Sequence, residues 1–216
     1  MDDATRAKNA EWMSYRDAYK TMLWFEKYGK AKNLIQMQLQ IATTDKNNAL
    51  SNLRLHLVGK NTHIDLGIDG AARATLPLLK SAYDDNAELV LNQKSGSARF
   101  RFRVSIVTRD TGIYEIAELR AACEQALAFL GTQDATAGGK KCLGVRLAFA
   151  KKDNIAHVEL KHTSQQTLTL AFKDDSAIWP DDAALYRTTD LLFANAKDHA
   201  QLISRTSPVA LVALFE

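Results

Sequence analysis

The stretch LIQMQLQI, residues 34–41, alternates apolar and polar side chains. Its apolar positions are Ile35, Met37, Leu39 and Ile41. Successive side chains of a β-strand point to opposite faces, so this pattern predicts a strand with one covered and one solvent-facing side. The runs NLRLHLV (52–58) and THIDLGID (62–69) repeat the alternation. Because such alternation is typical of antiparallel sheets with one wet face, the sequence predicts a mainly antiparallel sheet.

Helical patterns stand beside these strands. Apolar residues recur at three- and four-residue steps over residues 12–28 and again over 113–130, which predicts two amphipathic helices. Pro77 and Pro180 each head a segment that we expect to begin a short helix, because proline is favoured in the first helical turn. The other alternating or apolar runs predict strands at 87–93, 98–106, 142–150, 155–160, 167–172, 201–205 and 208–215.

The two halves of the chain therefore have the same predicted order: helix, three strands, helix, two strands. The expected fold class is α+β, with two similar copies that each pack a helix on a mainly antiparallel sheet. We expect a polar N-terminal tail over residues 1–11, a first copy over 12–108, and a second copy over 109–216 packed closely on the first. Identity between the copies is low, so this interpretation depends on the order and phase of the elements.

The composition is that of a soluble globular protein. Apolar residues make up 46% of the 216 positions and charged residues 25%, and the formal net charge of +3 is a small difference between 28 basic and 25 acidic residues. No apolar run approaches the roughly 20 residues needed to cross a bilayer, so no transmembrane segment is expected. The start of the chain also lacks the basic and apolar regions of a secretory signal.

The two cysteines leave an alternative open. Cys123 lies in a predicted helix and Cys142 at the start of a predicted strand, and they enclose 18 residues. A disulfide between them would join the helix to the strand. The alternative is two unpaired buried thiols, because free cysteine behaves as a small hydrophobic residue.

The motifs of common enzyme and metal sites are missing. The sequence has no phosphate-binding glycine loop, no paired Cys-x-x-Cys or His-Glu-x-x-His motif, and no Gly-x-Ser-x-Gly elbow. Among the five histidines, His56 and His63 could face each other across a hairpin, but the sequence offers them no third ligand. We therefore predict no metal site, no cofactor and no catalytic residue. Whether the protein is an enzyme stays open, and the sequence favours a protein that is not one.

The run SARFRFRVSI, residues 97–106, places arginine at every second position, at Arg99, Arg101 and Arg103. If strands 87–93 and 98–106 form a hairpin closed by KSGS (94–97), Glu88 lies opposite Arg103. The arginines are the best candidates for binding an anionic ligand or a protein partner. The small net charge and the lack of an aromatic residue on the same face argue against nucleic acid.

A longer run, residues 64–96, resembles a pattern from proteobacterial exported proteins known only as domains of unknown function. The likeness is carried by Asp69-Gly70, Leu76-Pro77, Asn86 and Asn92. The resemblance implies a location in the cell envelope and a non-enzymatic role. We therefore expect a non-catalytic binding or interaction module of the bacterial cell envelope, periplasmic or exported with its signal peptide absent from this chain. The alternative is a small cytoplasmic hydrolase whose site is assembled from loops between the copies.

Overall fold

A computed structural model of the chain describes residues 10–43, 52–134, 137, 139–162 and 166–216. The chain divides into two compact units. The first comprises the residues up to Tyr28 together with Met37–Arg103, and the second comprises Gly29–Gln36 and Val104–Glu216. Both units combine helices with antiparallel sheets, so the predicted α+β class is confirmed. The predicted tail over residues 1–11 falls mostly outside the described residues.

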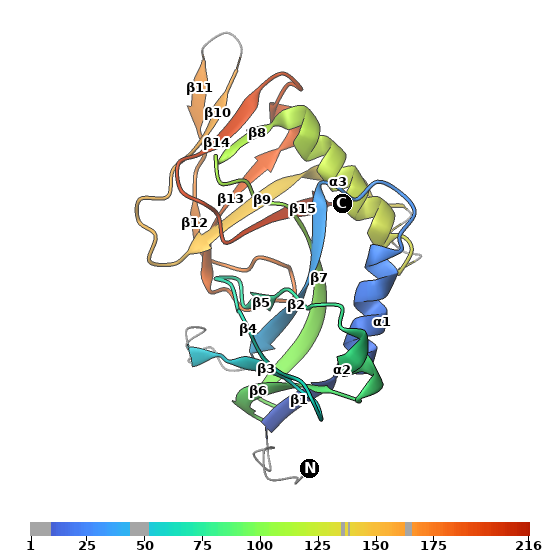
Figure 1. Cartoon of the computed structure of the whole chain (residues 1–216). Coiled ribbons are helices and arrows are strands. Elements are labelled where there is room, and N and C mark those ends of the chain that lie inside the picture. The colour runs from blue at the N-terminus through green and yellow to red at the C-terminus, as the bar shows by residue number, and fades with distance from the viewer. Residues whose placement is uncertain (1–9, 44–51, 135–136, 138, 163–165) are drawn as a thin grey trace. The chain divides into compact units, whose positions relative to one another are not determined.

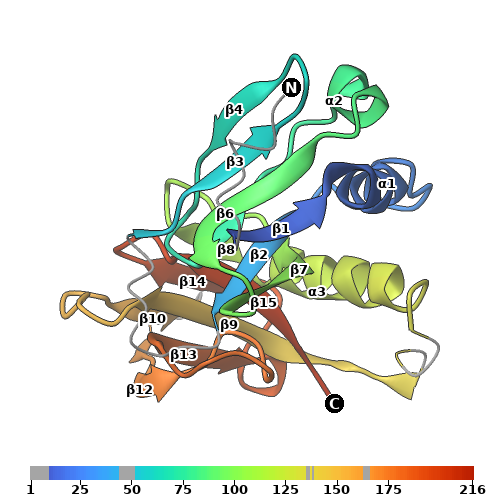
Figure 2. The same ribbon diagram turned by 90° about the horizontal axis from the view of Figure 1, so that it is seen from below.

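The first unit contains a four-stranded antiparallel sheet in the order β1 (Ala10–Ser14), β6 (Glu88–Lys94), β3 (Leu55–Val58) and β4 (His63–Leu66) (Figure 2). One face of this sheet is leucine-rich. Its central residues, Leu55, Leu57, Leu89 and Leu91, are at most 1% exposed. Alternation then turns His56, Val58 and Val90 to the other face. The predicted pattern of one covered and one wet side is confirmed for these strands.

Helix α1 (Tyr15–Glu26) follows β1 directly and buries Tyr15, Ala18, Met22 and Phe25. The Tyr15 hydroxyl donates a hydrogen bond to the carbonyl of Pro77 and accepts one from the amide of Leu79 at 2.9 Å. It thereby holds the segment that leads into the short helix α2 (Lys80–Asp84). The prediction that the first helix begins at residue 12 was wrong, because Ala10–Ser14 instead forms a strand whose residues pair with β6.

Strands β2 (Ile35–Thr43) and β7 (Ala98–Ile106) each contribute residues to both units. In the first unit, β2 lies between β7 and the two-residue strand β5 (Arg73–Ala74). Its apolar residues are buried as the alternation predicts: Ile35, Met37, Leu39 and Ile41 are at most 4% exposed.

The second unit also has a four-stranded antiparallel sheet, in the order β11 (Thr167–Thr169), β10 (Val158–Lys161), β14 (Gln201–Ser204) and β8 (Ile113–Glu115). Other strands pair in the order β12 (Lys173–Ser176), β13 (Tyr186–Leu192), β9 (Cys142–Ala150) and β15 (Ala210–Phe215), and β15 meets the end of β7 at Ile106. Helix α3 (Ile116–Leu130) packs on β9 and β15 (Figure 1).

Two predicted features of the element order were wrong. The segment after Pro180 is not a helix: Tyr186–Leu192 forms β13, which pairs with β9, and only the single turn η4 (Phe193–Asn195) follows it. Strands β6 and β7 do not form a hairpin, because β6 pairs with β1 and β3 whereas β7 pairs with β2 and β15. Tertiary pairing thus overrides the local turn signal in KSGS.

The two four-stranded sheets share one strand order. In the first unit, the hairpin β3–β4 lies beside the later strand β6, and β6 pairs with β1, the strand directly before helix α1. In the second unit, the hairpin β10–β11 lies beside the later strand β14, and β14 pairs with β8, the strand directly before helix α3. The registers also agree, because Ser14 pairs with Glu88 directly before α1, and Glu115 pairs with Gln201 directly before α3.

Two glycines with positive φ, one in each unit, differ in how closely other atoms approach them. Gly112 has φ +65° and a Cβ there would lie 2.1 Å from the carbonyl oxygen of Ser204, whereas Gly96 has φ +82° and no atom within 4 Å of such a Cβ. We expect Gly96→Ala to cost about 1–2 kcal/mol of unfolding free energy, from the left-handed backbone alone. Gly112→Ala should cost clearly more, because the strand pair must also separate. Urea unfolding measures both, and equal losses would contradict the close approach.

Candidate functional site

The predicted arginine row lies on β7 in the first unit, and its three members have different surroundings. Arg99 is exposed, while Arg101 and Arg103 are half-buried. The Arg103 Nε donates a 2.7 Å hydrogen bond to Oε1 of Gln40, which is itself 4% exposed. Arg103 is therefore fixed in the sheet, Arg101 is partly covered, and Arg99 is the solvent-facing member of the row. The expected partner Glu88 lies instead on β6, opposite Ser14 and Val58.

The first unit holds a second arginine in a structural role, on β5, which pairs with β2. Arg73 is 4% exposed and lies opposite Gln40 on β5. Its guanidinium contacts Oδ2 of Asp69 through Nε at 2.9 Å and through the terminal nitrogen at 2.8 Å. The other carboxylate oxygen of Asp69 accepts hydrogen bonds from the amides of Ala71 and Arg73. The charge of the buried arginine is thus paired within one turn, with a carboxylate that is itself partly exposed.

The sulfurs of Cys123 and Cys142 are joined in a disulfide. The bond connects the buried middle of α3 to the first residue of β9, with the Cα atoms 6.0 Å apart. The sequence left this pairing open because alternation along β9 places Cys142 out of phase with Val145 and Leu147. A bulge at the end of the strand resolves the conflict, since Phe215 pairs with Cys142 while Leu214 pairs with Gly144.

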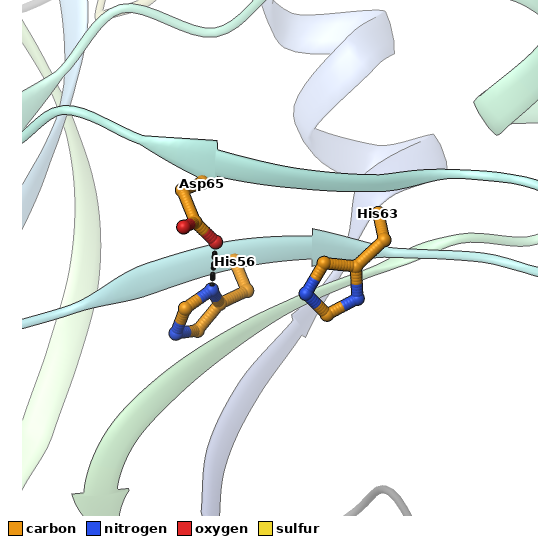
Figure 3. A group of neighbouring side chains, drawn as sticks. All are labelled: His56, His63 and Asp65. Atoms are coloured by element: carbon orange, nitrogen blue, oxygen red, sulfur yellow. Dashed lines mark hydrogen bonds and ion pairs between the residues drawn. The ribbon is translucent and has the colours of Figure 1, made fainter.

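The β3–β4 hairpin gathers three potential metal ligands on its outer face (Figure 3). His56 on β3 lies directly opposite Asp65 on β4, and His63 lies two residues before Asp65. The turn is closed by a 2.7 Å hydrogen bond from the amide of Gly59 to the carbonyl of Thr62. All three side chains therefore share one face, while the leucines of β3 occupy the other.

The contacts within this group are close. Nδ1 of His56 is 2.5 Å from Oδ1 of Asp65, and the ring centroids of His56 and His63 are 5.8 Å apart. The Asp65 side chain is 80% exposed and that of His56 is 32% exposed. The sequence already places His56 and His63 across a hairpin, but it misses Asp65. The signal that identifies Asp65 is the i, i+2 spacing from His63, which places both residues on one face of the strand.

The described residues also line two surface hollows. One, of about 600 Å³, is open and lies along Leu53, Arg54 and the loop after β4, with Asp65 at its edge. The other, of about 100 Å³, lies in the second unit beside Tyr114 and Arg109. Burial raises the pKa of Tyr114, whose hydroxyl accepts a 3.1 Å hydrogen bond from the amide of Arg109. The second hollow is too small for a typical small-molecule ligand.

A scan against protein-family models, a search of curated proteins and a search of solved structures each find no match to this chain. Among the described residues, no helix has the length and apolar character required to cross a membrane.

The disulfide should contribute measurably to the stability of the second unit. Replacing both cysteines, Cys123→Ala with Cys142→Ala, releases the loop between two positions 19 apart in the sequence and should lower the unfolding free energy by about 3 kcal/mol. Urea unfolding of the variant, and of wild type with and without reductant, measures this loss. A wild-type chain whose two thiols react with iodoacetamide under denaturing conditions before any reduction would contradict the bond.

Proposed function

We propose that the protein is a non-catalytic binding module of the bacterial cell envelope, and that Arg99 and Arg101 contact an anionic group on its ligand or protein partner. The observation that carries the proposal is that the arginines of β7 differ in their exposure to solvent. Arg103 is held by Gln40, whereas Arg99 extends into solvent two strand positions beyond Arg101. Side chains two apart on a strand are separated by about 7 Å, so the pair can contact neighbouring negative groups.

The disulfide supports the envelope location. Disulfides persist in exported proteins and are rare in the reducing cytosol. The bond between Cys123 and Cys142 therefore favours the periplasmic or exported location over the cytoplasmic alternative. The hydrolase alternative has no comparable support and stays a prediction.

We also infer that the chain is a tandem duplication. The shared strand order and the matching register before α1 and α3 support this interpretation. Under it, β15 is the counterpart of β7, and Ala210 and Val212 occupy the face that carries the arginines in the first copy. Both residues are at most 3% exposed. The second copy therefore forms this strand without arginines, which supports a role for the exposed Arg99 beyond the pairing of the strands.

The double variant Arg99→Gln with Arg101→Gln tests the anionic contact, with Arg109→Gln as the matched control. Arg109, like Arg99, is exposed, and it lies outside the row and contacts Glu118 at 2.8 Å. We expect the double variant to bind heparin more weakly by about fivefold per arginine, equivalent to roughly 1 kcal/mol each, since exposed ion pairs rarely exceed this value. The control should bind as wild type does.

Salt-gradient elution from immobilised heparin, followed by a titration in solution, provides the measurement. Elution of the double variant together with wild type would remove the arginines as a binding site. A loss in Arg109→Gln as large as that expected for one arginine of the row, about fivefold, would show that only overall charge matters.

A further inference from the structure

The His56, His63 and Asp65 group has the geometry of an open metal site. One ligand atom from each residue lies within 4.8 Å of the other two. Among the described residues, this is the group of at least three His, Cys, Asp or Glu side chains that lie close enough together to bind one metal ion. Zinc bonds to nitrogen and oxygen ligands at about 2.0–2.2 Å, which places tetrahedral ligand atoms about 3.4 Å apart. Rotation of two exposed side chains about their own bonds is enough to close the remaining distance.

The donor set selects the class of ion. Two imidazole nitrogens and one carboxylate oxygen suit zinc and its first-row neighbours, whereas calcium and magnesium prefer oxygen ligands alone. We propose that His56, His63 and Asp65 form a binding site for a divalent transition-metal ion, with zinc as the best match. The side-chain arrangement in Figure 3 carries this proposal, because both rings and the carboxylate lie on the same face of one short hairpin.

The hydrogen bond between His56 and Asp65 accounts for two of the three residues. It does not account for His63, which is exposed and lies opposite Val58 rather than opposite an acidic side chain. A metal ion gives a single reason for all three, because it would bind the His56 nitrogen and the Asp65 oxygen together with the second imidazole.

The second unit provides an internal comparison. In the β10–β11 hairpin, which has the same place in its sheet, the positions corresponding to His56, His63 and Asp65 are Glu159, Thr167 and Thr169. Glu159 is held by His157 at 2.5 Å and by Arg205 at 3.1 Å, and the hydrogen bond from His157 lowers its pKa. The hairpin therefore forms without the two histidines, so their presence on β3 and β4 is not a requirement of the fold.

Three protein ligands leave one tetrahedral position to water, unlike the four ligands of a structural zinc site. The exposed face of the hairpin makes that position accessible. We therefore assign the site to an exchangeable ion rather than to one that the fold needs for its stability. The proposal is independent of the arginines on β7, and either can fail without the other.

Isothermal titration of Zn²⁺ into the full untagged chain, with its disulfide intact, tests the site directly. Wild type should bind one zinc ion per chain. His63→Ala and Asp65→Asn should each weaken binding at least about tenfold, the loss typical of a disturbed metal site. His157→Ala is the control, because it removes a histidine from a different histidine–carboxylate pair, that of His157 with Glu159. Arg205 still contacts Glu159 in this variant, so zinc binding should be unchanged.

A second readout separates ligand loss from misfolding. Because zinc binds only the folded hairpin, it should raise the unfolding temperature of wild type and of His157→Ala clearly more than that of His63→Ala at the same zinc concentration. His63 and Asp65 are exposed, so their variants should unfold at the wild-type temperature without zinc. The proposal is overturned by any of three results: no saturable zinc binding to wild type, full affinity in His63→Ala, or equal binding of Mg²⁺.

Discussion

The register of the β3–β4 hairpin, which places His56 opposite Asp65, is the constraint on which both the core and the surface of the first unit depend. Side chains alternate along a strand, so a slip of one residue in this hairpin would exchange its two faces. In the observed register, Leu55 and Leu57 enter the core and the three polar side chains face outward. The hydrophobic effect that buries the leucines therefore also gathers the two histidines and the carboxylate, without any separate cost for assembling them.

Much of the strand structure could be predicted from alternation alone. The runs at 98–106 and 142–150 form strands with the predicted bounds, because their apolar side chains recur at every second residue. Pairing was harder to predict. A turn-like KSGS suggests a local hairpin, but β6 gains more by burying Leu89 and Leu91 between β1 and β3. The helix predicted after Pro180 was wrong because local signals were again overridden by strand pairing. The proline and the aspartates after it resemble a helix start, but Thr188 and Thr189 are buried in a strand.

The candidate sites show the same division between local and long-range information. Asp65 could have been added to the histidine pair from spacing, because hairpin register and the i, i+2 rule are local. The hydrogen bond that fixes Arg103 could not have been predicted in this way. Gln40 lies 63 residues away, and only the pairing of β2 with β7 brings the two side chains together. Likewise, the disulfide depends on a bulge in β9 that alternation does not reveal. Contacts between distant segments thus decide which predicted surface residues are available to a partner.

The central claim is that the register of one hairpin brings His56, His63 and Asp65 to a single ion. The most direct measurement is a zinc titration of the chain labelled with ¹⁵N-histidine, followed by NMR of the imidazole nitrogens. The ring signals of His56 and His63 should shift together and stop at one equivalent of zinc, while those of His157, His162 and His199 stay in place. A shift of His63 without His56, or shifts spread over all five histidines, would contradict the account.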